Sequence, residues 1–184
     1  TIQAHDYPII RGTSPPEGPS VISLDIETYG ILEGNDQTVF HPHQACVIDK
    51  ISPEDQIVTV GLAWRMPDTE EISNTILLWK SKADRLVLYQ WLKYIADRKG
   101  TLLGKNTVFD VSFLKYCDPL CNFYLQPWKG IQLDDLAIVN HLEYDQRPER
   151  SLKPLAELFG VADYSVNPVR GGGGKAKIPF DKEL

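Results

Sequence analysis

The side chains best suited to chemistry in this sequence are two carboxylates at the end of a short apolar run. Asp25 and Glu27 lie two positions apart in VISLDIE, whose apolar and β-branched residues predict a buried strand. Residues two apart on a strand point to the same side, so both carboxylates should emerge together at the strand's C-terminal end, where α/β sheets commonly place their sites. Two like charges at this spacing repel unless a cation lies between them, and hard oxygen ligands suit Mg²⁺ or Mn²⁺. The alternative is an acidic pair that is merely solvated, because such triplets are common.

A second polar cluster follows another predicted strand. In TLLGKNTVFDVSFL, Asn106 and Asp110 lie four apart on the first turns of an expected helix, so they share one of its faces, and Phe109 stands between them. The helix dipole also favours an acid at this place, which offers a purely structural explanation. Taken together, however, the two clusters favour a shared acidic site.

The elements that must position these residues are predicted from periodicity and turn residues. Ser81 and Asp84 resemble a capping box that opens a helix, and Gly100 marks its stop. Strands are predicted at residues 21–27, 56–65, 74–79 and 101–106 and near 131–133, and further helices at about 107–116, 134–142 and 151–160. Residues 1–19 are expected to form an irregular lead-in, and residues 30–55 a long polar excursion. Strands that come first and then alternate with helices indicate an α/β fold whose sheet contains at least one antiparallel strand.

Composition restricts the class of protein. With 184 residues, 42% hydrophobic and 24% charged, the chain is typical of one soluble globular domain. A net charge of −6 argues against duplex DNA binding by counterion release, but not against an enzyme that gathers carboxylates around metal ions and holds a few nucleotides. No apolar run approaches the roughly 20 residues that span a bilayer, and no signal peptide is evident. Three cysteines predict free thiols without disulfide partners, and a first residue other than Met suggests a piece of a longer chain.

The order of these motifs resembles that of a known family, the proofreading 3′→5′ exonuclease domains of family A, polymerase I-like DNA polymerases, which belong to the DEDD exonuclease superfamily. DIET at 25–28 resembles the family's first motif, and GKNTVFD at 104–110 resembles the second. LDDLAIVNHL at 133–142 and SLKPLAELFG at 151–160 are similar to the helices that follow. GGGGKAKIPFDKEL at 171–184 resembles the stretch that precedes the third motif. The likeness covers residues 20–184 and implies one ribonuclease H-like domain, a mixed β-sheet flanked by helices.

The resemblance also implies an activity and a set of site residues. Asp25, Glu27 and Asp110 would hold two divalent cations, Mg²⁺ or Mn²⁺, and hydrolyse a single-stranded DNA 3′ end to nucleoside 5′-monophosphates. Thr28 and Asn106 would contact the terminal nucleotide, and Ile31 would separate the last bases. Phe109 would lie at the substrate or pack in the core. A polymerase domain in the same parent chain and a cytoplasmic location, in a bacterial or phage-infected cell, are expected.

One departure from the family is expected to matter. The third motif, a Tyr or His shortly before an Asp, should follow Leu184, so the domain is expected to be truncated and this fragment impaired. His141 and Asp145 come too early to supply that motif. The spacing of His41, His43 and the cysteines matches no usual zinc pattern. Two alternatives stay open: an RNA-trimming relative with the same carboxylates, and a non-catalytic domain that supports a polymerase or another partner.

Overall fold

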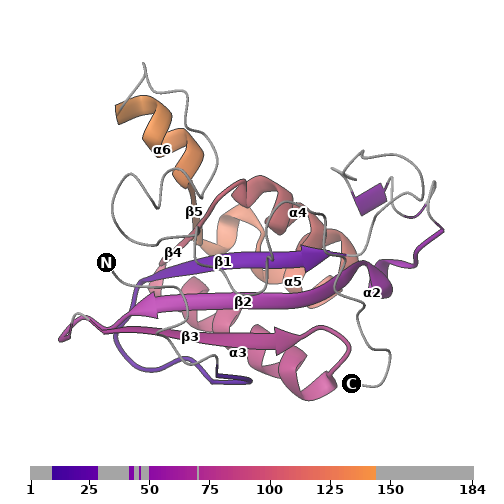
Figure 1. The fold of residues 1–184 in the computed structure, drawn as a ribbon, viewed down its shortest axis with the longest axis horizontal. Helices are drawn as coiled ribbons and strands as arrows, with labels where there is room; N and C mark the ends of the chain where they lie inside the picture. Colours follow the sequence, from indigo (N-terminus) through magenta and orange to yellow (C-terminus); the bar gives the residue numbers. More distant parts are fainter. Residues whose placement is uncertain (1–9, 29–41, 44–45, 47–49, 70, 144–184) are drawn as a thin grey trace, which may run out of the picture. The chain divides into compact units, whose positions relative to one another are not determined.

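The computed structural model describes residues 10–28, 42, 43, 46, 50–69 and 71–143, which all belong to one compact unit, Pro8–Arg147. Figure 1 shows the elements in this part of the chain. They are β1 (Val21–Thr28), α2 (Pro53–Gln56), β2 (Ile57–Arg65), β3 (Ile72–Leu78), α3 (Lys82–Arg98), β4 (Thr101–Gly104), α4 (Thr107–Cys117), α5 (Pro119–Tyr124), the 3₁₀ helix η1 (Pro127–Lys129), β5 (Gln132–Asp135) and α6 (Leu136–Glu143).

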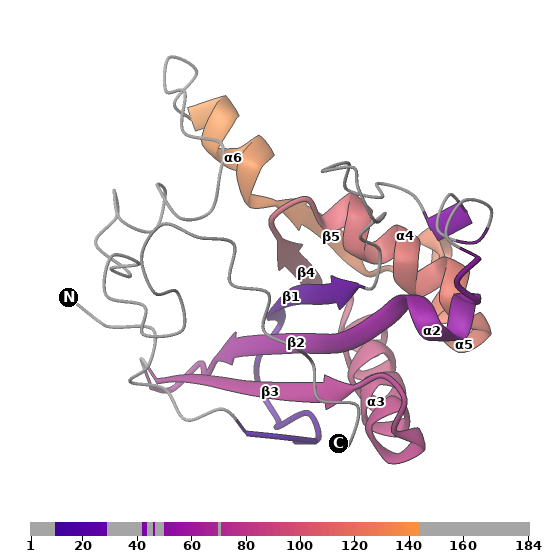
Figure 2. The same cartoon turned by 45° about the vertical axis from the view of Figure 1, so that its right-hand side comes forward.

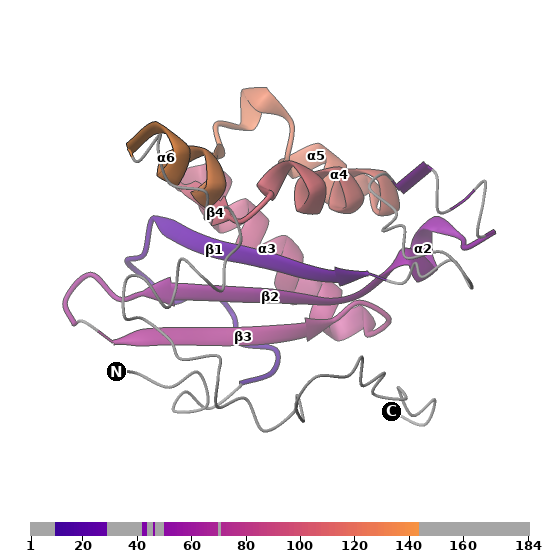
Figure 3. The same ribbon diagram turned by 45° about the horizontal axis from the view of Figure 1, so that its top comes forward.

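The strands form one mixed sheet in the order β3-β2-β1-β4-β5. The pairs β1–β2 and β2–β3 are antiparallel, whereas β1–β4 and β4–β5 are parallel. Helices α3, α4 and α5 lie on one face of this sheet (Figures 2 and 3). The predicted α/β class, with antiparallel strands in a mixed sheet flanked by helices, is therefore confirmed.

The core lies between the sheet and these helices. Ile22, Leu24 and Ile26 alternate along β1 and are buried, so the residues between them point to the opposite face. Asp25 and Glu27 accordingly share the exposed side of β1, as their spacing predicted. Large aromatic side chains fill the helix side of the core, among them Trp79, Trp91 and Phe113.

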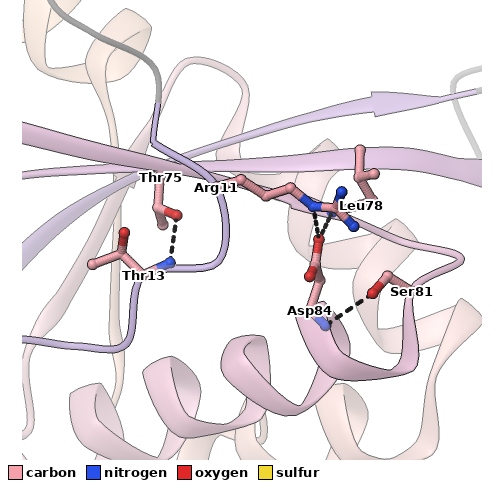
Figure 4. Close-up of polar contacts among 6 residues, drawn as sticks. All are labelled: Arg11, Thr13, Thr75, Leu78, Ser81 and Asp84. Carbon is pink, nitrogen blue, oxygen red and sulfur yellow. Dashed lines mark hydrogen bonds and ion pairs between the residues drawn. The ribbon is translucent and has the colours of Figure 1, made fainter. Parts of the chain in front are cut away.

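Helix α3 begins where the sequence predicted, but its capping differs in one half. The Ser81 hydroxyl accepts a hydrogen bond from the Asp84 N–H at 3.3 Å, as an N-cap should. The Asp84 carboxylate does not complete a capping box. It accepts instead from the Leu78 N–H at 2.7 Å and from the Arg11 Nε at 3.0 Å (Figure 4). The start of the helix is thereby joined to the end of β3 and to the N-terminal segment.

The N-terminal segment is irregular in its described part, yet it is held to the rest of the unit. The Ile76 N–H donates to the Ile10 carbonyl at 2.8 Å, and the Gly12 N–H donates to the Ile76 carbonyl at 3.1 Å. The Trp91 Nε1 of α3 donates to the Thr13 carbonyl at 2.7 Å. Residues 10–13 therefore follow the outer edge of β3 and reach α3, whereas residues 1–9 lie outside the described residues.

Several element predictions were wrong in detail. β3 begins at Ile72 instead of residue 74, β4 ends at Gly104 instead of residue 106, and α2 was not predicted. The helix expected from residue 134 begins at Leu136, because Asp134 and Asp135 still pair with β4 as the last residues of β5. Helix α5 was not predicted, since six residues are too few to show a helical period. The Asp118 carboxylate caps it by accepting from the Leu120 and Cys121 N–H groups, both at 2.8 Å. The predicted helix at 151–160 and the stretch at 171–184 lie outside the described residues.

Candidate active site

The candidate residues gather where three parallel strands end. β1, β4 and β5 are neighbours that run in the same direction, so their C-terminal ends meet at one edge of the sheet. Asp25 and Glu27 stand near the end of β1, α4 with Asp110 begins just after β4, and Asp135 ends β5. Acidic side chains at the ends of three neighbouring strands, and not only Asp25 and Glu27 on β1, therefore lie at the same edge of the sheet.

Asp110 is the electrostatic centre of this edge. The residue is 3% exposed, and its Oδ2 atom has no hydrogen-bond partner among the described residues. Burial raises the pKa of Asp110 to about 8, and the charges of Asp25, Asp135 and Glu27 add to the rise. A backbone hydrogen bond donated by Ile26 acts in the opposite direction. The fold therefore brings the three predicted carboxylates within electrostatic reach of one another. Favourable helix-dipole placement alone does not account for a carboxyl whose surroundings oppose its charge.

A cation just beyond the end of the neighbouring strand acts on Asp25. Lys105 follows directly after β4, whose pairing with β1 ends at Ser23 and Leu103. The surrounding protein atoms raise the pKa of the Asp25 carboxyl, and the Lys105 ammonium partly offsets this rise. Although Asp25 is exposed by solvent-accessible area, its carboxyl is crowded enough to make the charged form less favourable.

Gly104 provides the space in which Asp110 sits. A Cβ atom at position 104 would lie 2.8 Å from the Leu24 carbonyl oxygen, 3.0 Å from the Thr107 hydroxyl and 3.5 Å from Oδ2 of Asp110. The first distance is too short for any side chain without movement of β1. Glycine at the end of β4 is therefore needed for close approach of the two strands and the helix start.

Asp135 is a site residue that the sequence reasoning missed. Its charge acts on Asp110, and its carboxylate accepts hydrogen bonds from the Thr107 N–H at 2.9 Å and the Ala137 N–H at 2.8 Å. The acid is visible in QLDD, but the strand that it ends is not, because QLDD has strand character only through its pairing with β4. The residue was assigned instead to the start of a helix.

The predicted substrate-binding residues have different surroundings. Thr28 ends β1 just after a register irregularity between Glu27 and Thr28, and bulges of this kind re-aim side chains at sheet edges. Asn106 is exposed and adopts a left-handed backbone with φ 64°, and its side chain makes no cap hydrogen bond. Phe109 packs on Phe113 with ring centroids 4.6 Å apart, which agrees with a packing role. Ile31 lies outside the described residues.

Cys46 and Cys117, whose spacing matches no usual zinc pattern, both contact the side-chain amide of Gln56. The Gln56 Nε2 donates to Cys46 Sγ at 3.0 Å, and the Cys117 thiol donates to Gln56 Oε1 at 3.7 Å. Burial raises the pKa of the Cys117 thiol to about 12, which keeps it protonated. All three cysteines are free thiols. Among the residues that the structure describes, no three or more His, Cys, Asp or Glu side chains are grouped closely enough to hold a metal ion, and this includes the candidate carboxylates.

The surface hollows add one observation about Asp25. A hollow of about 250 Å³ lies on the exposed face of β1, β2 and β3 and is lined by Ser23, Asp25, Gly61, Leu62, Ala63, Asn74, Thr75 and Ile76. A larger hollow of about 550 Å³ lies by the start of β1 and the β2–β3 turn, and none of the candidate residues lines it. The larger of these two hollows therefore lacks the candidate carboxylates, whereas the smaller one is lined by Asp25.

Comparison with known proteins does not identify the class of this protein. No protein-family model matches the chain, and no curated protein is significantly similar to it. In the part of the chain that the structure describes, no helix is both long and apolar enough to cross a membrane.

Proposed function

We propose that this chain is a ribonuclease H-like 3′→5′ exonuclease domain of the proofreading type, which uses divalent cations to shorten a single-stranded DNA 3′ end. The mixed sheet with helices on one face supports the fold part of the proposal. The motif order of DIET and GKNTVFD supports the activity. The observation that carries the proposal is the buried Asp110 carboxyl, whose pKa is raised to about 8 among three further acids.

The donor set fits hard divalent cations. Asp25, Glu27 and Asp110 offer carboxylate oxygens, and no described residue donates a hydrogen bond to the buried Oδ2 of Asp110, so this oxygen is available to a metal ion. Because the carboxylates are not already grouped as a ligand set, cation binding would have to draw them together. A cation would also relieve the repulsion that raises the pKa of Asp110. When bound, divalent cations supply an activated water and stabilise the leaving oxygen of a phosphodiester.

The remaining roles belong to side chains around the carboxylates. Asp25 and Glu27 would face the scissile phosphate from the exposed side of β1. The Asp110 carboxyl would stay in place on the buried side. Asn106, with an exposed and uncapped side chain, would contact the terminal nucleotide together with Thr28. A frayed single strand is the expected substrate, since unpaired bases can be splayed and stacked. The product would be a nucleoside 5′-monophosphate.

Metal binding is the first test, because it needs only the carboxylates. Titration of Mn²⁺ into the metal-free protein should show binding that Asp25→Ala and Glu27→Ala each weaken. Asp97→Ala is the matched control, since Asp97 pairs with Lys93 on the surface of α3. Equal Mn²⁺ affinity in all of these proteins would contradict the proposed site.

Hydrolysis is the second test. The protein, expressed to the natural stop codon of its gene, is incubated with Mg²⁺ or Mn²⁺ and 5′-labelled DNA or RNA oligonucleotides, frayed or fully paired at the 3′ end. Stepwise shortening of frayed DNA is expected, and it should fall by on the order of 10³-fold in Asp25→Ala, because metal ions supply several kcal/mol of transition-state stabilisation. Faster shortening of RNA would instead support the RNA-trimming alternative. Full activity in Asp25→Ala would overturn the mechanism.

A further inference from the structure

The start of α4 lacks the cap that a helix usually takes from its own sequence. The first N–H groups of a helix have no partner within the helix, and an Asn at the N-cap normally accepts one of them. Asn106 occupies the N-cap of α4, but its left-handed backbone takes the side chain out of range, and it makes no cap hydrogen bond. The first N–H of α4, that of Thr107, is in any case not the one that an N-cap side chain accepts, so it needs an acceptor from elsewhere.

That acceptor comes from a different strand. The Asp135 Oδ2 accepts from the Thr107 N–H at 2.9 Å, across 28 residues of sequence. The second oxygen, Oδ1, accepts from the Ala137 N–H at 2.8 Å at the start of α6. The Thr107 hydroxyl adds a third connection by donating to the Asp134 carbonyl at 2.7 Å. One carboxylate thus joins the N-termini of two helices to the end of β5.

We infer that Asp135 is a positioning residue of the candidate site, which caps α4 from β5, fixes Asp110 one turn further along and leaves the Asn106 side chain available to the substrate. This inference rests on the proposed function. Thr107 is 1% exposed and sits beside Gly104, so the helix start is enclosed between β4 and β5. Asp135 binds the N–H at the first helical position, so it holds the helix start without using the Asn106 amide, which makes no cap hydrogen bond.

The fixed helix start matters because the Asp110 carboxyl has few other contacts that orient it. It accepts a backbone hydrogen bond from Ile26, but no described residue donates to its Oδ2. The position of Oδ2 therefore depends on the Ile26 contact together with the backbone of the first turn of α4. Loss of the Asp135 cap would let that turn fray, and the oxygen offered to a cation would no longer have one position. Partners that orient metal ligands in this way commonly change metal affinity or activity by about 10- to 100-fold when they are removed.

Asp118 provides a matched control within the same chain. It also caps a helix, α5, through two N–H groups, and it accepts a further hydrogen bond from the Tyr89 hydroxyl at 2.6 Å. It lies at the C-terminal end of α4, away from Asp110. Removing Asp118 should lower thermal stability at least as much as removing Asp135, without reaching the candidate site.

The test measures Mn²⁺ affinity by calorimetry in Asp135→Ala, Asp135→Asn, Asp118→Ala and Asp118→Asn, each at a temperature at which circular dichroism shows it folded. Asp135→Ala should bind Mn²⁺ about 10- to 100-fold more weakly, and Asp135→Asn, which keeps one acceptor oxygen, should lose less. Both Asp118 variants should stay within about twofold of wild type. Amide hydrogen exchange at Thr107 should accelerate in Asp135→Ala and not in Asp118→Ala.

The outcomes separate the two proposals. If the wild-type protein binds no Mn²⁺, the proposed function fails. If the wild type binds Mn²⁺ and Asp135→Ala binds it equally well, or if Thr107 exchange is unchanged, the positioning role fails while the proposed function stands. Equal weakening by the Asp118 variants would show a general effect of stability and would likewise overturn the positioning role. Where the protein hydrolyses DNA, Asn106→Ala should raise KM more than it lowers kcat.

Discussion

Two of the buried aspartates lie in the first turns of helices, and their surroundings are opposite. Asp84 stands in the first turn of α3 and Asp110 in the first turn of α4, with 6% and 3% of their surfaces exposed. Burial alone would raise the pKa of Asp84, but hydrogen bonds from the Leu78 N–H and the Arg11 guanidinium outweigh it, and the pKa is lowered (Figure 4). No described residue donates a hydrogen bond to Oδ2 of Asp110, which lies in a partly desolvated place among acidic neighbours, and its pKa is raised to about 8.

The difference shows that an aspartate in the first turn of a helix has opposite effects on stability in different surroundings. The charge of Asp84 is favourable in the folded state because its donors compensate for lost hydration. The charge of Asp110 is unfavourable in the metal-free folded state, so this residue lowers stability at neutral pH instead of raising it. A carboxylate such as that of Asp110 lowers the stability of the metal-free fold. A bound cation is the simplest partner that would offset this loss of stability.

The largest effect is expected for removal of the compensated carboxylate. Asp84→Ala should lower the free energy of unfolding by about 3 kcal/mol, because the partly buried Leu78 N–H loses its acceptor and the Arg11 contact is lost. Much of this effect belongs to the Leu78 N–H, since the Arg11 side chain is 58% exposed and its charge is screened. Urea denaturation measures the change. Asp97→Ala, which removes an exposed pair with Lys93, should stay close to wild type in its free energy of unfolding. An equal loss of stability in Asp84→Ala and Asp97→Ala would contradict the assignment of Asp84 as a compensated carboxylate.

The opposite sign is expected at the second carboxylate. Asp110→Asn should raise the free energy of unfolding by about 2 kcal/mol at pH 8 in the presence of a chelator, because a neutral amide of the same shape removes the repulsion. Added Mn²⁺ should stabilise the wild type and not the variant, since a ligand that binds only the folded state shifts unfolding. Destabilisation by Asp110→Asn under these conditions would contradict the assignment of Asp110 as an unfavourable charge.

A smaller effect is expected where the space beside Asp110 is filled. Gly104→Ala should lower stability by about 1.5 kcal/mol, because the new Cβ would lie 2.8 Å from the Leu24 carbonyl oxygen. Gly61→Ala is the control, since its Cβ would meet the Asp25 carbonyl oxygen at an ordinary 3.6 Å. The control should be neutral or slightly stabilising. Similar thermal midpoints for the two variants would show that the close approach at Gly104 is not required.

The smallest expected effect is the change in the free energy of unfolding per pH unit. The folded pKa of Asp110, about 8, exceeds the unfolded value of about 3.9, so between these pH values the folded state binds more protons and stability falls as pH rises. The slope should reach at most about 1.4 kcal/mol per pH unit in metal-free protein, and Asp110→Asn should remove it. Asp84 acts in the other direction: its folded pKa is lowered, so its contribution is lost only as pH falls below about 4. Unfolding at a series of pH values would test both signs, and an unchanged slope in Asp110→Asn would contradict the first.

The periodic elements could be predicted because their signals are local. Alternating burial places Asp25 and Glu27 on one face of β1, and Ser81 caps α3 as its type and place indicated. The end of β5 could not be predicted, since QLDD has strand character only through its pairing with β4. The same error concealed Asp135. Helix α5 was missed because Asp118 caps it through two N–H groups that no periodic pattern reveals.

The sequence by itself determined which residues carry charge and that Asp25 and Glu27 stand near the end of one strand, and it predicted that Asp25, Glu27, Asn106 and Asp110 belong to a site for metal-dependent chemistry. Only the tertiary structure decided which of Asp84 and Asp110 is compensated. At Asp84 the Leu78 N–H lies six residues away, but it becomes a donor only because the end of β3 folds onto the start of α3, and Arg11 lies 73 residues away. Burial and repulsion at Asp110 arise only when β1, β4 and β5 end at the same edge of the sheet. A pKa depends on what surrounds a group in space, and the order of residues in the chain does not give that.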